Sequence, residues 1–349
     1  MRITLKSALL FIAMLGVGFA SVENAQAVEK SKTKHISQKS KAQSTTSKVK
    51  AAPTTKRSGR VLSMQKKAVA HVSSSSATQW QEARKLAVQS GSALVIDQEG
   101  GDALFQKNAN FIAPIASITK LMTAMVVLDS SPNLLAPITI SDEDVDYLRG
   151  SHSRLHVGSV MTRESALLLA LMSSENRAAN ALARHYPGGM PAFLAAMNIK
   201  AQALGMRDTR FEDPTGLNSN NVSTATDLAK MVAAAHGYPL IREFSTTSEA
   251  TVEIGGRELA YHNTNPLVKS AAWEVGLSKT GYIQEAGKCL VMQARVADRP
   301  VVIVLLDSAG KLTRVGDANR IKRWMESAQA SRRVPTHATL VREKVHHPG

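Results

Sequence analysis

Residues 277–306 read LSKTGYIQEAGKCLVMQARVADRPVVIVLL, and no other stretch of the chain says more about its architecture. It contains three largely apolar runs of strand length, separated by two short groups of turn-forming residues. The runs are 277–282, 288–296 and 300–306, and the turns fall at 285–287 and 298–299. Because connections this short join antiparallel neighbours, the stretch predicts three adjacent antiparallel strands.

The sequence on either side of this stretch adds a helix after it and two strands far before it. Residues 315–327 have apolar side chains at helical spacing. Near the other end, 92–96 and 103–105 have strand-like composition and are joined around Gly100-Gly101, which predicts a hairpin. A helical pattern beginning at Gln79 predicts the start of the folded region.

The middle of the chain is predicted to be helical. Thr162 precedes one helical segment, and Thr224 with Asp227 resembles a capping box in front of another. The expected helices cover 117–128, 162–171, 175–184, 191–204 and 228–235. Strands at both ends around a helical middle predict an α+β fold, with an antiparallel sheet built from both chain ends, flanked by helices, and a helical subdomain.

The first 27 residues have the order of a cleavable secretory signal peptide. Arg2 and Lys6 precede an uncharged, mostly apolar run over 7–20, and Ala25-Gln26-Ala27 offers a site of the small-x-small type. The alternative is an uncleaved membrane anchor. Fourteen residues are short against the roughly 20 that span a bilayer, so export into the periplasm is the preferred interpretation.

The net charge of +15 does not indicate a nucleic-acid partner, because it is concentrated outside the predicted fold. Residues 28–70 contain twelve Lys and Arg against Glu29 alone, whereas 71–330 is balanced. The segment 28–78 is also rich in Ser and Thr and is expected to be a disordered linker. It could touch anionic membrane or wall polymers, or act only as a solvated spacer. Residues 331–349 form a short basic tail.

Ser117-Ile118-Thr119-Lys120 is the first candidate for chemistry. On a helix the first and fourth residues share a face, so the hydroxyl and the amine could meet. A serine nucleophile needs a base, and a lysine serves when burial or a nearby cation lowers its pKa. The Ser-x-x-Lys spacing alone is weak evidence for a catalytic pair, because it recurs at four other serines. The simpler alternative is a serine that caps a helix and a lysine exposed to solvent. Only this copy follows a Pro-containing loop and opens an apolar helix.

Two further motifs lie downstream. Ser174-Glu175-Asn176 interrupts two apolar helical stretches and could present a hydroxyl and a carboxamide, although Ser174 could simply cap a helix. Lys279-Thr280-Gly281 occurs once and falls within a predicted strand. A glycine there marks a close approach of backbone or ligand, and an ammonium beside a hydroxyl suits a carboxylate. The alternative is an edge strand with exposed polar residues.

Taken together and in this order, the three motifs resemble those of the penicillin-binding proteins and serine β-lactamases. More narrowly, the chain is similar to the low-molecular-mass D-alanyl-D-alanine endopeptidase/carboxypeptidase family over about residues 80–330. Further matching stretches are 114–122, 148–158 (LRGSHSRLHVG), 171–183 (LMSSENRAANALA), 213–217 (DPTGL) and 278–281. The resemblance implies a β-lactamase/transpeptidase-like fold for a catalytic domain at 79–330, with peptidoglycan stem peptides and cross-links as substrates and β-lactams as acylating inhibitors.

The same resemblance implies a role for each motif residue. Ser117 would be the acyl-enzyme nucleophile, Lys120 its proton acceptor, and Ser174 the group that passes a proton toward the leaving amine. The substrate-binding residues would be Asn176, which holds an amide, Lys279 and Thr280, which face the substrate carboxylate, and Gly281 and Tyr282 beside them. The backbone N–H groups of Ser117 and Tyr282 would form the oxyanion hole.

Other candidates are weaker, and no metal or cofactor is expected. His152 and His156 lack the glutamate of a zinc-protease motif and are predicted to lie at the surface. Cys289 is predicted to be a small core residue. Residues 213–216 (DPTG) are predicted to form a turn first and a wall of the site second.

Several functions remain open at this point. An endopeptidase that cuts D-alanyl cross-links is favoured over a carboxypeptidase, because only nineteen residues follow Ala330, too few for the extra domain and amphipathic helix of the anchored carboxypeptidases. A serine β-lactamase shares the motifs but needs a water-activating group that the sequence does not identify. A non-catalytic wall-binding protein is the third alternative.

Overall fold

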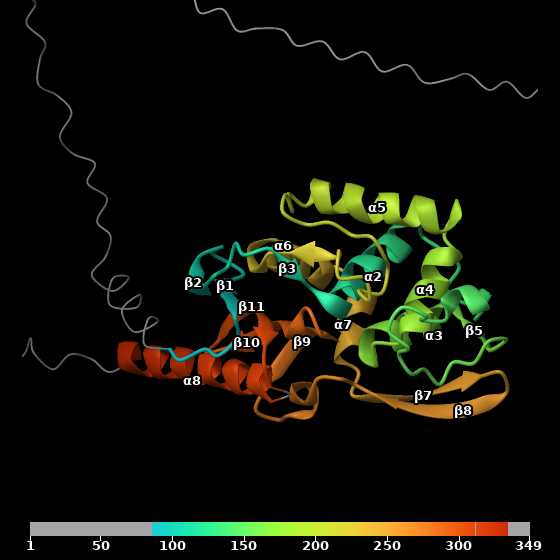
Figure 1. The fold of residues 1–349 in the computed structure, drawn as a ribbon. Coiled ribbons are helices and arrows are strands. Elements are labelled where there is room, and N and C mark those ends of the chain that lie inside the picture. Colours follow the sequence, from blue (N-terminus) through green and yellow to red (C-terminus); the bar gives the residue numbers. More distant parts are fainter. Residues whose placement is uncertain (1–85, 311, 334–349) are drawn as a thin grey trace, which may run out of the picture. The chain divides into compact units, whose positions relative to one another are not determined.

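The computed structural model describes residues 86–310 and 312–333 (Figure 1). The predicted signal peptide, the linker 28–78 and the tail from residue 334 lie outside the described residues, as does most of the helix predicted to begin at Gln79. No helix in the described ranges combines the length and the hydropathy that a membrane span requires.

A five-stranded sheet organises the described part of the chain. Its strands are β1 (Ser92–Asp97), β2 (Ala103–Lys107), β9 (Glu274–Ile283), β10 (Gly287–Val296) and β11 (Arg299–Ser308), in the order β2-β1-β11-β10-β9. Every neighbouring pair is antiparallel. The prediction of an antiparallel sheet built from both chain ends is therefore confirmed, and β1 joins the two halves by pairing with β11.

Both faces of the sheet are buried, which explains the nearly continuous apolar runs in its strands. Val301, Ile303 and Leu305 of β11 pack in one core with α8 (Thr313–Arg333), while the alternating Val302 and Val304 pack in a second core on the opposite face. Helix α6 (Ala225–His236) covers that second face (Figure 1). The sheet thus lies between one helix and a larger helical body.

That helical body matches the predicted subdomain. Its helices are α2 (Lys120–Asp129), α3 (Arg163–Met172), α4 (Asn176–Arg184), α5 (Gly189–Ala203) and α7 (Pro239–Thr246), with short 3₁₀ turns η1 (Ala116–Thr119), η2 (Asp142–Asp144) and η3 (Pro266–Lys269). Thr162 caps α3 and Thr224 caps α6, each by accepting a hydrogen bond from a backbone N–H of the first turn.

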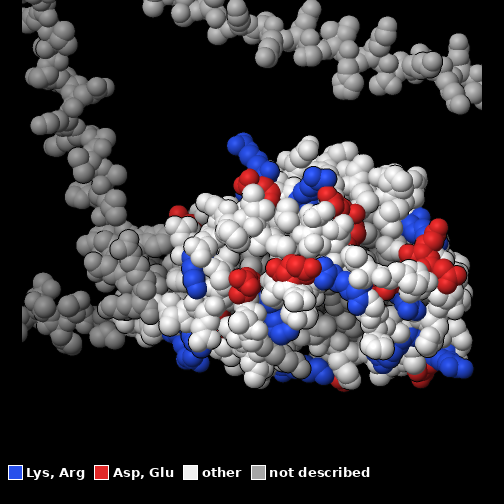
Figure 2. Space-filling view, in the orientation of Figure 1, with Lys and Arg blue, Asp and Glu red and all other residues white. Residues whose placement is uncertain are grey.

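Smaller strand pairs complete the fold. They are β3 (Ala113–Pro114) with β6 (Val222–Ser223), β4 (Pro137–Thr139) with β5 (Val160–Thr162), and the hairpin of β7 (Glu249–Ile254) and β8 (Arg257–His262). The sequence analysis predicted neither this hairpin nor α7. Charges of both signs are interspersed on the face shown in Figure 2, in keeping with the neutral balance of residues 71–330.

The prediction of a helix beginning at Gln79 is wrong for Leu86 and Ala87, the two residues of its pattern that the structure describes. Residues 86–89 form no helix. Their backbone is held instead by side chains from elsewhere, since Lys107 Nζ donates to the carbonyl of Val88 and the Asp317 carboxylate accepts from the N–H of Gln89. These tertiary bonds replace the intrahelical ones.

Asp317 of α8 fixes the point where the described chain enters the domain, and its removal is expected to be costly. The fully buried carboxylate accepts from the N–H groups of Gln89 and Ser90 and from Ser90 Oγ, and pairs with Arg320. Because Asp317→Ala leaves these donors and a cation without partners, the variant should lose about 3 kcal/mol of unfolding free energy in urea. Glu326→Ala, which removes an exposed pair on the same helix, should change it by less than about 0.5 kcal/mol.

Candidate active site

Ser117 and Lys120 meet where a 3₁₀ turn becomes a helix. Ser117 lies in η1 and Lys120 is the first residue of α2, so the two residues share one turn of helix. Lys120 Nζ lies 2.8 Å from Ser117 Oγ. Lys120 is fully buried, whereas Ser117 is partly accessible. The structure therefore brings the hydroxyl and the amine of the first motif into direct contact.

Two other acceptors fix the amine of Lys120. Its Nζ donates to Asn176 Oδ1 at 2.7 Å and to the carbonyl of Thr215 at 2.8 Å. A neutral amine has two N–H groups and one lone pair. When the two N–H groups donate to Asn176 and Thr215, the lone pair can accept the hydroxyl proton of Ser117. A general base requires this geometry.

The surroundings of Lys120 favour its neutral form near neutral pH. Burial lowers its pKa to about 7, against the opposing influence of the carboxylates of Asp213 and Glu175. Desolvation disfavours the ammonium because the interior solvates charge poorly, and the two carboxylates keep the pKa from falling further. The amine can thus gain and lose a proton within the physiological range.

Ser174 occupies the sharp break between α3 and α4. Its backbone is left-handed, with φ of 63°, a conformation that is uncommon for residues other than glycine. Glu175, not Ser174, is the residue at the N-cap of α4, so the alternative of a capping serine is not what the structure has. The break instead turns Ser174 Oγ toward the sheet, where it lies 2.9 Å from Lys279 Nζ.

Lys279 is the second buried amine of the site. It projects from β9 and donates to Ser174 Oγ and to the carbonyl of Thr280. Burial, followed by the charges of Lys120 and Arg314, lowers its pKa well below the usual lysine value. Burial and the neighbouring positive charges therefore favour the neutral form of Lys279.

Asn176 and Thr280 are held by neighbouring loops. Asn176 Nδ2 donates to Ser151 Oγ at 2.9 Å, while its Oδ1 accepts from Lys120. Thr280 Oγ1 lies 2.7 Å from Thr264 Oγ1. Asn176 therefore has both ends of its carboxamide engaged, and a substrate amide would have to share or replace one of these bonds.

Two glycines let backbone approach Ser117. A Cβ on Gly281 would lie 3.1 Å from the Ser117 nitrogen, and one on Gly216 would lie 1.9 Å from the carbonyl oxygen of Ala116. Tyr282, the next residue on β9, is 58% exposed. The N–H groups of Ser117 and Tyr282 thus belong to backbone segments that meet at this point. The predicted motif residues come together around one serine.

The sequence analysis gave no role to Arg314, which lies in the first turn of α8. It is partly buried and donates to the carbonyls of Gly281 on β9 and Cys289 on β10, at 3.0 and 2.9 Å. A single arginine in a helix belongs to no recognisable sequence motif. Only the packing of α8 against β9 and β10 brings Arg314 near residues 279–281.

The backbone carbonyl of Thr215 is a second contributor that the sequence analysis did not foresee. Residues 213–216 form both the predicted turn and a wall of the site, because the Asp213 carboxylate accepts from the N–H groups of Thr215 and Gly216. This turn aims the carbonyl of Thr215 at Lys120. The sequence of residues 213–216 predicted a turn and a wall of the site, but not the contact of the Thr215 carbonyl with Lys120.

The remaining candidates lie as predicted. Cys289 is buried in β10, and burial raises the pKa of its thiol to about 11, so it is no nucleophile. His152 and His156 are exposed. No cluster of three or more His, Cys, Asp or Glu side chains suited to a metal ion occurs within 86–310 and 312–333.

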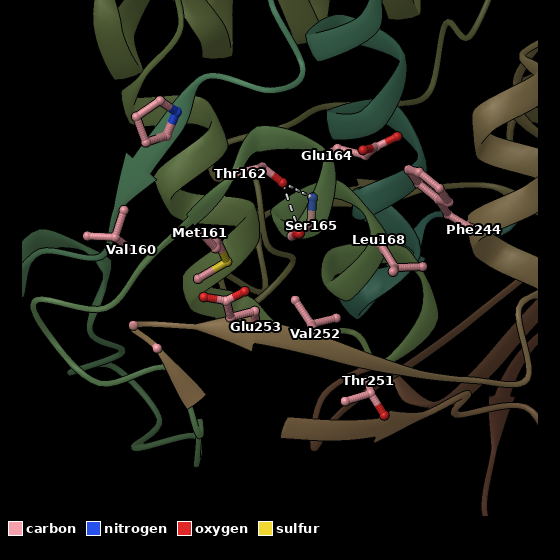
Figure 3. Close-up of a pocket in the computed structure, with 13 residues that line it drawn as sticks. Val160, Met161, Thr162, Glu164, Ser165, Leu168, Phe244, Thr251, Val252 and Glu253 are labelled. Atoms are coloured by element: carbon pink, nitrogen blue, oxygen red, sulfur yellow. Dashed lines mark hydrogen bonds between the residues drawn. The ribbon is translucent and has the colours of Figure 1, made fainter. Parts of the chain in front are cut away.

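A separate hollow of about 590 Å³ opens beside the β7–β8 hairpin (Figure 3). Val160 and Met161 of β5, Leu168 of α3 and Val252 of β7 give it apolar walls, and Glu164 and Glu253 add two carboxylates. None of the motif residues lines it. The hollow is therefore distinct from the site around Ser117.

Gly216 is predicted to be irreplaceable on conformational and steric grounds. Its φ is +84°, and an added methyl group would overlap the backbone of Ala116. Gly216→Ala should therefore lose more than about 3 kcal/mol of unfolding free energy. Gly101 has φ of +73° with no atom near the position of a Cβ, so Gly101→Ala should lose only about 1 kcal/mol. Equal losses in urea titrations would contradict the steric argument.

Comparison with known proteins confirms the family expected from the motifs. A family model described as D-alanyl-D-alanine carboxypeptidase, Peptidase S11, matches residues 75–310. The D-alanyl-D-alanine endopeptidase of Pseudomonas aeruginosa is 50% identical over 244 residues, which cover 69% of this chain and 79% of that protein.

Solved structures agree with this assignment. The DD-transpeptidase of Streptomyces K15 superposes with a TM-score of 0.65 and 30% identity over 69% of this chain and 98% of that one. Penicillin-binding protein D2 of Listeria monocytogenes, solved in its ampicillin-bound form, superposes with a TM-score of 0.61 and 26% sequence identity. This superposition also covers 69% of this chain and 98% of that one. Sequence, fold and family model agree, and the chain belongs to the Peptidase S11 family of D-alanyl-D-alanine carboxypeptidases.

Proposed function

We propose that this protein is an exported serine DD-peptidase that hydrolyses D-alanyl cross-links in peptidoglycan through an acyl-enzyme on Ser117. The observation that supports the proposal is the contact between Ser117 Oγ and Lys120 Nζ. The same amine donates hydrogen bonds to Asn176 Oδ1 and to the carbonyl of Thr215. Membership of the Peptidase S11 family supports the same reaction.

In the proposed acylation, Ser117 Oγ attacks the D-alanyl carbonyl carbon while its proton moves to Lys120. The N–H groups of Ser117 and Tyr282 stabilise the negative charge on the carbonyl oxygen. The C–N bond then breaks, and the departing amine takes the proton that Lys120 had accepted, by way of Ser174, which is hydrogen bonded to Lys279. Lys120 is neutral again after this step. Water then attacks the ester carbonyl while one of its protons passes to Lys120. As the C–Oγ bond breaks, Lys120 returns that proton to Ser117 Oγ, which releases the product and restores both residues.

Lys279 and Thr280 are proposed to bind the carboxylate beside the scissile bond. Lys279 is buried, and Arg314 supplies a second positive charge behind the same strand. An arriving carboxylate compensates the repulsion between these cations, so binding favours the protonated form of Lys279. Asn176 is proposed to bind the amide of the acyl chain, and Gly281 to allow the close approach of substrate.

Cleavage of cross-links is preferred to removal of terminal D-alanine because the Pseudomonas aeruginosa relative, at 50% identity, is named an endopeptidase. Carboxypeptidase activity is the alternative, in line with the description of the family model. A role in cell-wall remodelling and cell shape follows from either reaction. A β-lactamase on the same fold differs in that it would release the penicilloyl group rapidly.

Location in the periplasm is part of the proposal. The composition of residues 1–27 supports a cleavable signal peptide, and the basic composition of 28–78 supports a linker between it and the catalytic domain at 79–330. Twelve positive residues in 28–70 suit weak contact with anionic membrane or wall polymers, and the basic tail 331–349 adds to this charge.

Replacement of the nucleophile is the first test. Ser117→Ala should abolish covalent labelling by fluorescent penicillin and the release of monomers from purified cross-linked muropeptides, both followed by mass analysis. Ser173→Ala is a matched control, because that hydroxyl bonds only the carbonyl of Leu169 in the described residues and should leave both signals intact. Persistent labelling of Ser117→Ala, or loss of only terminal D-alanine from monomers by the native enzyme, would contradict the proposal.

The pH dependence of acylation tests the role of Lys120. Since its pKa is about 7 and the neutral amine accepts the proton, the acylation rate constant should rise with pH to a plateau above about 7. Below that pH it should fall about tenfold per unit. Lys120→Arg, which stays protonated, should lose about 10²–10⁴-fold of the rate and show no such midpoint. A native profile that is flat between pH 5 and 8 would exclude Lys120 as the base.

A further inference from the structure

Ser151 connects the loop after η2 to the second motif. Its Oγ lies 2.9 Å from Nδ2 of Asn176, whose Oδ1 accepts from Lys120. Ser151 belongs to the stretch 148–158 (LRGSHSRLHVG), which contains none of the three motifs. A hydroxyl from outside the motifs is thus hydrogen bonded to the carboxamide that in turn contacts the proposed base.

A carboxylate of the same loop determines how the Ser151 hydroxyl can act. Asp146 accepts hydrogen bonds from the backbone N–H groups of Leu148, Arg149 and Ser151. Burial raises the pKa of Asp146, but a hydrogen bond from the Ser151 hydroxyl and these backbone bonds hold it below its usual value. Asp146 is therefore ionised at neutral pH, and an ionised carboxylate can only accept hydrogen bonds.

These hydrogen bonds fix the orientation of the Asn176 carboxamide. A serine hydroxyl has a single proton to donate. Because that proton goes to Asp146, Ser151 Oγ can only accept from Asn176, and the amide nitrogen must face it. The amide oxygen is then directed at Lys120. The second N–H of the amide has no acceptor within 86–310 and 312–333, which leaves it for the acyl amide that Asn176 is proposed to bind.

The opposite orientation of the amide would disable the proposed base. With the amide nitrogen directed at Lys120, the neutral amine would accept from that N–H through its lone pair. The same lone pair takes the proton of Ser117, so the hydroxyl would lose its acceptor. The protonated amine would also lose an acceptor, which lowers the pKa of Lys120. The orientation of one amide therefore affects both the rate and the pH dependence of acylation.

We propose that Ser151 and Asp146 are positioning residues for acylation. They keep the oxygen of the Asn176 carboxamide directed at Lys120. The proposal rests on the proposed reaction of Ser117 and adds two residues to it. In the part of the chain that the structure describes, neither residue is hydrogen bonded to the proposed nucleophile or base, so both act through Asn176.

The first test measures the rate constant of acylation by penicillin against pH in the full-length protein. Ser151→Ala should lower the plateau about fivefold, because one orienting hydrogen bond is lost. It should also move the midpoint of the profile to a lower pH than in the native enzyme. The charged groups around Lys120 are unchanged in this variant, so the shift reports the orientation of the amide. These groups are Asp213 in the 213–216 turn, Glu175 before α4 and Lys279 on β9, with Arg314 of α8 next to Lys279.

A double-mutant cycle tests whether Ser151 acts through Asn176. In the Asn176→Ala background, Ser151→Ala should have no further effect on the rate constant, because no amide is left to orient. Ser151→Thr keeps the hydroxyl and should restore most of the native rate. Ser141→Ala is the matched control, since it removes a hydroxyl that caps η2 just before the loop and should change neither the rate nor the midpoint.

Asp146→Asn tests the same orientation without removing a hydroxyl, because its amide can donate to Ser151 Oγ and free the serine proton. The variant should change the rate and the midpoint in the same direction as Ser151→Ala. Native rates and midpoints in both variants, or an undiminished effect of Ser151→Ala in the Asn176→Ala background, would overturn the positioning role. Absent penicillin labelling of the native enzyme would overturn the reaction at Ser117 instead.

Discussion

The burial of the Lys120 amine is the constraint on which the rest of the site depends. Removing an ammonium from water costs several kcal/mol unless its hydrogen bonds are replaced. The replacements come from three segments far apart in the sequence: Ser117 in η1, Asn176 at the start of α4 and the carbonyl of Thr215. The hydrogen bonds of one buried nitrogen therefore connect the turn that holds Ser117, the helical subdomain and the 213–216 turn.

A second buried amine turns this constraint into chemistry. Lys279 is as deeply buried as Lys120, and the charge of Lys120 contributes to the lowered pKa of Lys279. In the proposed acylation, Ser174, which is hydrogen bonded to Lys279, passes a proton toward the leaving amine. Arg314 keeps a positive charge behind β9, because a guanidinium does not deprotonate.

The sequence predicted those parts of the molecule whose signals are local. Apolar runs and short turns were sufficient for β9, β10 and β11, and a spacing of three residues was sufficient for the contact of Ser117 with Lys120. The helix expected at Gln79 was wrong at Leu86 and Ala87, where Lys107 and Asp317 hold the backbone of the next two residues in a non-helical course. Arg314 and the carbonyl of Thr215 could not be predicted, since only packing brings them to the site and a carbonyl has no sequence signature.

At two positions of the site, tertiary contacts hold the backbone in a conformation that the residue itself disfavours. Ala116, directly before Ser117, and Ser174 both have left-handed backbones, at φ of 48° and 63°. Each such residue lowers the stability of the fold by of order 1–3 kcal/mol, so the surrounding contacts must hold its backbone in place. At Ala116 the backbones of Gly216 and Gly281 press against the turn, and at Ser174 the start of α4 is held by Asn176. The strain at Ala116 accompanies the contact of Ser117 with Lys120, and the strain at Ser174 accompanies its own contact with Lys279. The fold therefore loses some stability in order to form both serine–lysine contacts before any substrate binds.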